Sequence, residues 1–153
     1  MTYTVAVFAY DGCFISGIAG PLDVFNIANT HNSVLKGPDA APLFSWKLYS
    51  QDGKPIKTST GLLIPVEGNM QDVHGSDICV IPGVDHIYGS EVVQCARKLN
   101  ESIGDWLRQL HQENTTLAAN CSGAFILAEA GLLDKKEATT SWWLAHHFKN
   151  NYP

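Results

Sequence analysis

Short runs of apolar residues that end in turns constrain the fold of this chain more than any other feature. They cover residues 3–9, 77–83 and 115–120. Runs without polar alternation are typical of strands buried on both faces, as in parallel sheets. Helical stretches separate the runs, so the sequence predicts an α/β fold with a mainly parallel sheet and right-handed crossovers.

The rest of the chain predicts further elements. Helices are expected at residues 22–29, with Pro21 at the first helical position, at 91–112 with a possible break near Asn100, and at 122–130, stopped by Gly131. Strands are expected at residues 44–50, 62–66 and 138–141, the second of these demoted toward a sheet edge by Pro65. No repeat or linker interrupts the chain.

Length and charge limit the classes of function. The 153 residues suit one domain, and a net charge of −5 disfavours direct binding of nucleic acid by this segment. Charged residues make up 16% of the chain, below the roughly 25% typical of soluble domains. This deficit predicts that surface is buried by self-association or by a neighbouring domain. No run is long enough to span a membrane and no signal peptide is evident, so a cytoplasmic location is expected.

The sequence gives little evidence for a metal site or a disulfide framework. The four cysteines form no CxxC pair, and the six histidines form no HExxH motif. We therefore expect no metal site, no cofactor and no disulfide framework. A cysteine acting as a nucleophile, or simply filling the core, remains open.

The segment 120–124 carries the clearest chemical signal. Its sequence, Asn-Cys-Ser-Gly-Ala, joins a buried strand to an alanine-rich helix, which is the setting of a nucleophile elbow. Cys121 would project from the turn in a strained backbone conformation, and the following helix would favour its thiolate. The alternative is a small buried cysteine in a tight turn.

Several motifs resemble one family. Residues 20–25 (Gly-Pro-Leu-Asp-Val-Phe), Ile81-Pro-Gly83 and above all residues 120–134 with the following Ala138-Thr-Thr resemble the ThiJ/PfpI superfamily. Within it, the chain looks most like the amino-terminal domain of AraC-type transcriptional regulators related to GlxA and FtrA. The resemblance covers essentially the whole chain. It implies a three-layer sandwich with a flavodoxin-like sheet and a class I glutamine amidotransferase-like fold.

The resemblance also implies site residues. Cys121 would be a nucleophilic or redox-sensitive thiol, and backbone amides of Val84 and Ser122 would form an oxyanion-type site. Family enzymes carry an acidic residue and a histidine where this chain has Gly17 and Ser141. General acid–base assistance is typically worth about 10²–10⁴-fold in rate, so both departures disfavour catalysis.

A ligand pocket is expected beyond the strand ends, where the loops after residues 9, 83 and 120 converge. Its predicted lining consists of Cys13, Phe14, Gly17, Gly83, His86, Ser141 and Trp142. Asp11 and His86 are candidate substitutes for the missing base, although a turn aspartate and a solvated loop histidine are the simpler interpretations. Trp142 and Trp143 could equally be core or interface residues.

These observations favour a domain that senses an unknown small-molecule effector for an AraC family regulator. DNA would be bound only by a carboxy-terminal helix-turn-helix domain absent from this sequence, and the sensing domain itself is expected to be truncated at its carboxy-terminal end. A homodimer is expected. The alternatives are a cysteine-dependent hydratase or amidase with Cys121 as nucleophile, and redox sensing through a Cys121 sulfenic acid.

Overall fold

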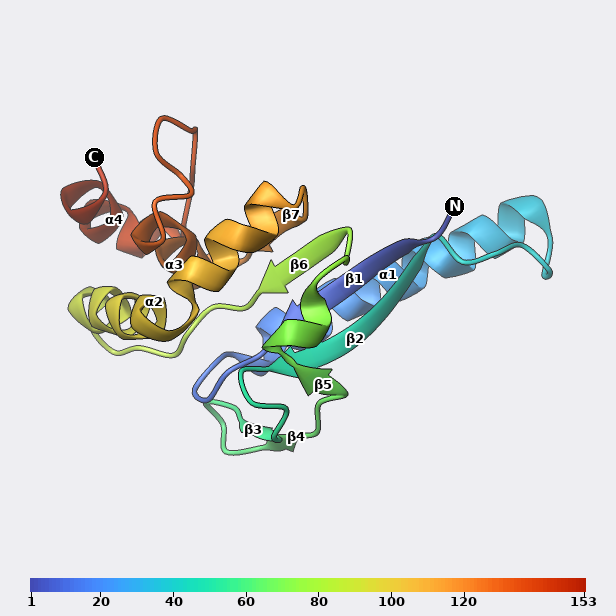
Figure 1. The fold of residues 1–153 in the computed structure, drawn as a ribbon, viewed down its shortest axis with the longest axis horizontal. Helices are drawn as coiled ribbons and strands as arrows, with labels where there is room; N and C mark the ends of the chain where they lie inside the picture. Colours follow the sequence, from blue (N-terminus) through green and yellow to red (C-terminus); the bar gives the residue numbers. More distant parts are fainter.

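A parallel five-stranded sheet forms the centre of the molecule. A computed structural model describes all residues, 1–153. The strand order is β5-β2-β1-β6-β7, and every neighbouring pair is parallel. The strands, labelled in Figure 1, are β1 (Tyr3–Phe8), β2 (Phe44–Ser50), β5 (Gly68–Asn69), β6 (Ile78–Ile81) and β7 (Thr116–Ala119).

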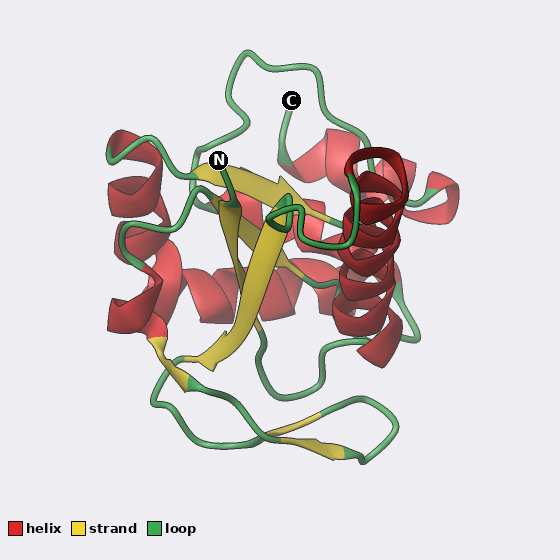
Figure 2. Cartoon of the chain, turned by 90° about the vertical axis from the view of Figure 1, so that its right-hand side faces the viewer, coloured by secondary structure: helices red, strands yellow, loops and turns green.

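Two long helices cover opposite faces of the sheet (Figure 2). They are α1 (Ile15–Lys36) and α2 (Gly89–Gln112). On the α1 face, the Phe25 ring packs 4.8 Å from the Phe44 ring of β2. On the other face, the Phe8 ring of β1 packs 4.6 Å from the Trp106 ring of α2. Side chains alternate between faces along a strand, so these contacts place one helix on each side.

Short elements complete the chain. The hairpin of β3 (Ile56–Lys57) and β4 (Leu63–Ile64) forms a separate antiparallel sheet. After the five-stranded sheet come α3 (Ala124–Glu129) and α4 (Ala145–Asn151), which lie near α2 in Figure 1. Single turns of 3₁₀ helix form η1 (Met70–Val73), η2 (Cys121–Gly123) and η3 (Trp142–Leu144).

The core lies between the sheet and α2 and continues under α3. Its largest fully buried side chains include Phe8, Ile81, Ile103, Leu107 and Phe125. None of the helices has both the length and the apolar character that crossing a membrane requires. The predicted α/β class with a mainly parallel, flavodoxin-like sheet is confirmed.

Helix α1 is much longer than the predicted segment 22–29, and Pro21 lies inside it rather than at its first position. Proline has no N–H, so within a helix it leaves the carbonyl four residues earlier without its usual donor. Here that carbonyl belongs to Gly17, and it accepts a hydrogen bond of 3.0 Å from Asn120 Nδ2 instead. The prediction was wrong because this donor lies far along the sequence.

Two predicted strands need correction. Residues 138–141 form no strand: the segment returns to the elbow, where Thr140 Oγ1 donates to the Cys121 carbonyl at 3.1 Å. In the segment 62–66 only Leu63–Ile64 is strand, and it pairs with β3 rather than with an edge of the main sheet. Helix α2 continues through Asn100 without a break.

Candidate functional site

The loops after β1, β6 and β7 meet at the carboxyl edge of the sheet. The strand order reverses its direction between β1 and β6, and ligands of α/β sheets bind outside the strand ends at such a switch point. Cys13 and Val84 form an isolated antiparallel bridge across it. Beside the bridge, Phe14 N–H donates to the Gly83 carbonyl at 2.8 Å. The loops therefore converge as predicted, through backbone hydrogen bonds.

Cys121 occupies the elbow in the expected strained conformation. Its φ is +53°, in the left-handed region that non-glycine residues rarely adopt, and the residue is exposed. The turn is too tight for a side chain at position 123, since a Cβ on Gly123 would lie 2.7 Å from the Ile81 carbonyl oxygen. Cys121 Sγ lies 3.1 Å from Ser141 Oγ, and either atom can be the donor. The elbow thus presents its sulfur beside a hydroxyl.

Asn120 joins the loop after β7 to the loop after β6 and to the first turn of α1, a role that the sequence analysis missed. Its Oδ1 accepts from Gly83 N–H at 3.2 Å, and its Nδ2 donates to the Gly17 carbonyl. Gly17 is buried, and a Cβ built there would lie 2.7 Å from Pro82 Cβ and 2.9 Å from Asn120 Oδ1. An acidic side chain at position 17 therefore has no room unless its neighbours move. Proline at position 21, which frees the Gly17 carbonyl, was the available signal.

Ser122 contributes a side-chain hydroxyl to the site, in addition to the backbone amide that the sequence suggested. Its hydroxyl accepts from Val84 N–H at 2.9 Å and donates to the Val84 carbonyl at 3.0 Å. Both residues are buried. An anion bound by the Val84 amide would have to displace this hydroxyl, so the oxyanion-type role of Val84 and Ser122 stays a prediction.

His86 uses both ring nitrogens within the protein. Nδ1 lies 3.0 Å from the Val84 carbonyl, and Nε2 accepts from Trp143 Nε1 at 3.4 Å. These partners fit the neutral tautomer with its proton on Nδ1, assigned from the hydrogen bonds. The Phe14 ring meets the imidazole edge-on at 6.3 Å. To serve as a base, His86 would have to give up its contact with Trp143.

The predicted ligand residues do not share one surface. Cys13, Gly17 and Gly83 are buried, whereas the Trp142 side chain is 83% exposed. A neighbouring cleft of about 510 Å³ is lined by Asp11 and other residues at the ends of β1 and β2, but not by Cys121. There, Asp11 Oδ1 accepts from the Lys57 amide and fixes the β3–β4 hairpin.

The four cysteine thiols differ in how deeply they are buried. Burial raises the pKa of the Cys13 thiol, and raises that of Cys79 to about 12. Cys95 is half-buried, and burial raises its pKa too. Cys121 is the exposed thiol of the four. No group of three His, Cys, Asp or Glu side chains lies close enough together to hold a metal ion.

Comparison with known proteins identifies the family of this chain. Residues 3–152 match the DJ-1/PfpI family. The chain belongs to that family. It is 31% identical over 140 residues to a protein encoded in the cpoL 5′ region of Streptomyces lividans, covering 92% of this chain and 88% of that protein.

Regulators are among the relatives. The chain is 28% identical over 142 residues to the HTH-type transcriptional regulator CdhR of Pseudomonas aeruginosa, covering 93% of this chain but only 38% of CdhR. The crystal structure of an AraC family transcriptional regulator from Pseudomonas putida superposes with a TM-score of 0.68 at 16% identity, over 99% of this chain and 73% of that one. The latter similarity shows a shared fold.

Proposed function

We propose that this chain is the small-molecule-sensing domain of an AraC-type transcriptional regulator. In this proposal the domain binds an effector at the elbow, acts as a homodimer, and relies on a carboxy-terminal helix-turn-helix domain for DNA contact. The observation that carries it is the match to CdhR, which extends over 93% of this chain but only 38% of that regulator. The net charge of −5 agrees with DNA affinity residing elsewhere.

The chemistry around Cys121 supports binding rather than turnover. The hydrogen-bonding partner of its sulfur is the Ser141 hydroxyl, which is a far weaker base than an imidazole or a carboxylate. Both His86 ring nitrogens are engaged, and Asp11 is bound to the Lys57 amide. No side chain that could draw a proton from the thiol at neutral pH is hydrogen-bonded to it. An exposed thiol without an assisting base suits reversible binding of an effector.

Ligand binding is tested by thermal unfolding against a panel of amino acids, amines and small carboxylic acids. A compound at one hundred times its Kd stabilises the folded state by about 2.7 kcal/mol. At about 2–4 °C per kcal/mol for this chain length, the Tm rises by roughly 5–11 °C. We expect Ser141→Ala and Trp142→Ala to reduce the shift and Leu62→Ala, on an exposed loop residue, to leave it intact. A shift indifferent to the first two variants would place the compound elsewhere.

The enzyme alternative rests on the exposed sulfur at positive φ, the geometry of a nucleophile elbow. It is tested by incubating the chain with a primary amide and with an isonitrile and following the products by NMR. We expect no turnover that depends on Cys121. Product formation by the unmodified chain that disappears in Cys121→Ala would favour a hydratase or amidase over a sensor.

A further inference from the structure

The chemistry of the elbow leaves unused a cleft at the carboxyl ends of β1 and β2. The two strands run parallel as far as the pair Phe8 and Tyr49, and Ala9 N–H then donates to the Tyr49 carbonyl at 2.8 Å. The residues that follow both strands line a space of about 510 Å³, which we call the β1–β2 cleft. Ligand pockets typically measure about 300–1,000 Å³, and in parallel sheets they lie beyond the carboxyl ends of the strands. The β1–β2 cleft therefore has the size and the position of a binding site.

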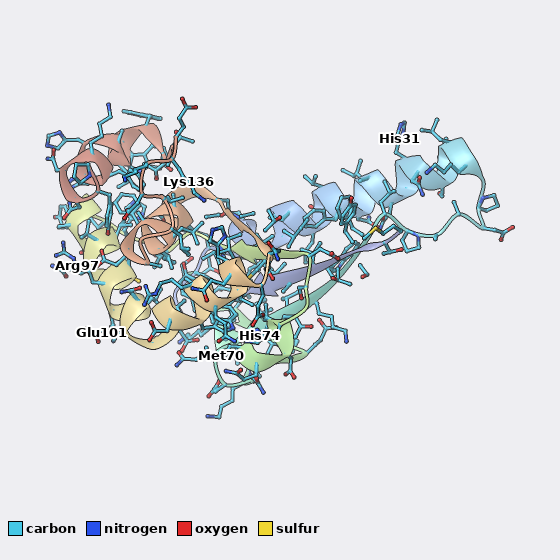
Figure 3. The ribbon with its side chains drawn as sticks, turned by 45° about the horizontal axis from the view of Figure 1, so that its top comes forward. His31, Met70, His74, Arg97, Glu101 and Lys136 are labelled. Carbon is cyan, nitrogen blue, oxygen red and sulfur yellow. The ribbon has the colours of Figure 1, made fainter.

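Two further parts of the chain give the β1–β2 cleft an apolar wall. In Figure 1 the β3–β4 hairpin lies beside the ends of β1 and β2, and Pro55 and Ile56 of this region line the cleft. Helix α2 supplies Leu99. Figure 3 shows Arg97 and Glu101, two positions before and after it, on the outer side of α2. At 100° per residue Leu99 faces the opposite way, toward the cleft.

Hydrogen bonds hold the walls of the β1–β2 cleft in place. Asp11 Oδ1 accepts from the Lys57 amide at 2.8 Å, and Gly12 N–H donates to the Lys57 carbonyl at 2.8 Å. These bonds fix the hairpin against the loop after β1. The buried Ser50 hydroxyl donates to the Lys54 carbonyl at 2.8 Å and fixes the turn after β2. The cleft is therefore formed before a ligand binds, so binding costs little ordering of the backbone.

Charges of both signs line the β1–β2 cleft. Asp11 and Asp52 contribute carboxylates, and Lys54 contributes an ammonium group. Asp11 uses Oδ1 for the Lys57 amide, which leaves Oδ2 for another donor. Lys54 Nζ donates to Asp52 Oδ2 at 2.6 Å, which uses one of the three donors of the ammonium group. Both side chains of this pair are exposed, so a change of partner costs little.

We propose that the β1–β2 cleft binds an α-amino acid with an apolar side chain. The ammonium group of the ligand donates to Asp11 Oδ2, and its carboxylate accepts from Lys54 Nζ. Its side chain packs against Ile56 and Leu99. The two carboxylates and one ammonium group of the lining give it a net charge of −1, which disfavours phosphates and other dianions. Cys121 does not line this cleft, so the site is separate from the elbow.

One hydrogen bond links the β1–β2 cleft to the elbow. Tyr10 lines the cleft, and its hydroxyl donates to the Pro82 carbonyl at 2.6 Å. The next residue, Gly83, donates its amide to Asn120 Oδ1. An amino acid in the cleft therefore contacts a side chain that holds the loop beside the elbow, and can influence effector binding there. This link rests on the proposed function, whereas the site in the cleft does not.

Titration of the full chain with L-leucine, followed by two-dimensional NMR of its amides, tests the site. We expect saturable shifts that are largest for the amides of Asp11, Gln51 and Ile56. The amine 3-methylbutylamine and the acid 4-methylpentanoate keep the leucine side chain but lack its carboxylate and its ammonium group respectively. Each should bind at least about tenfold more weakly than leucine, because each loses a charge-assisted hydrogen bond.

Variants identify the groups that bind the ligand. Asp11→Asn removes the charge but keeps an oxygen that can accept from the Lys57 amide, so the hairpin stays in place. We expect Asp11→Asn and Lys54→Gln each to raise the Kd for leucine at least about tenfold. Asp39→Asn and Lys149→Gln change exposed residues that do not line the cleft, and these matched controls should leave the Kd unchanged.

The outcomes separate the β1–β2 cleft from the elbow. A leucine Kd indifferent to both cleft variants, or the absence of any shift at millimolar leucine, would overturn the site. Shifts that are largest at the elbow and disappear in Trp142→Ala would overturn it too. Equal affinity for leucine and for the amine would overturn the amino acid as the ligand. The thermal-shift panel with Ser141→Ala and Trp142→Ala measures effector binding separately, so failure of the cleft leaves the proposed function standing.

Discussion

Replacing Gly17 with alanine tests the close packing between α1 and the elbow. The added Cβ would lie 2.7 Å from Pro82 Cβ and 2.9 Å from Asn120 Oδ1, both shorter than real Cβ contacts. Neither neighbour can move freely, since Pro82 is buried and Asn120 is bound to the Gly83 amide and the Gly17 carbonyl. The helix must therefore shift away from β6.

Two opposing effects set the magnitude. Overpacking a well-packed site costs about 1–3 kcal/mol. Alanine in a helix is favoured over glycine by about 1 kcal/mol. The net expectation is a loss of roughly 1 kcal/mol of stability, and a Tm lower by about 2–4 °C.

The assay is thermal unfolding of Gly17→Ala beside Ser16→Ala, a change at an exposed position on the same turn that already carries a Cβ. Ser16→Ala should change stability by less than about 0.5 kcal/mol. If Gly17→Ala instead raised the Tm, helix propensity would have decided the result and the steric argument would be refuted. An acidic residue at position 17 needs the same Cβ, so the outcome also bears on whether this chain could carry one.

Three further predictions concern strain, acid and the core. Cys121→Gly should raise the urea concentration at the midpoint of unfolding. Relief of the left-handed conformation is worth about 1–2 kcal/mol, which exceeds the entropic cost of glycine, about 0.5–1 kcal/mol. A lower midpoint would contradict this. Hydrogen bonds from the Thr4 amide and hydroxyl hold the pKa of Asp77 below its usual 3.8. The ionised Asp77 thus stabilises the fold above pH 3.8, and this stabilisation is lost as the pH falls through the folded-state pKa. Asp77→Asn should therefore lower the Tm near neutral pH but not at strongly acid pH. Phe125→Ala should cost about 3–5 kcal/mol in urea unfolding, since Phe125 is fully buried with its ring 4.9 Å from that of Phe148; a loss below about 1 kcal/mol would show a site that collapses.

The sequence predicted those parts of the fold that depend on local pattern. Continuous apolar runs identified β1, β6 and β7, because a strand buried on both faces has no polar alternation. Small residues at 122–124, between a strand and a helix, identified the elbow, because a sharp turn requires close backbone approach. In both cases the determining residues are neighbours in sequence.

The errors arise where the determining partner is distant in sequence. Pro21 could be placed inside a helix only by knowing that Asn120 satisfies the Gly17 carbonyl. The Ala-Thr-Thr segment has β propensity, but its Thr140 hydroxyl binds the elbow and no strand pairs with it. Likewise, Ser122 was chosen for its amide, whereas its buried hydroxyl holds both polar groups of Val84. Such pairings follow from the assembled sheet edge.

The hydrogen bonds that join the loops at this edge of the sheet have a consequence for local unfolding. Loops usually open one at a time, and their amides exchange with solvent independently. Here the Gly83 and Val84 amides, in the loop after β6, donate to side chains that follow β7. The Phe14 amide, in the loop after β1, donates to the Gly83 carbonyl. Opening one loop breaks the bonds that hold the others, so these amides should exchange with deuterium as one cooperative unit. The edge of the sheet that carries Cys121 would then open all at once or not at all.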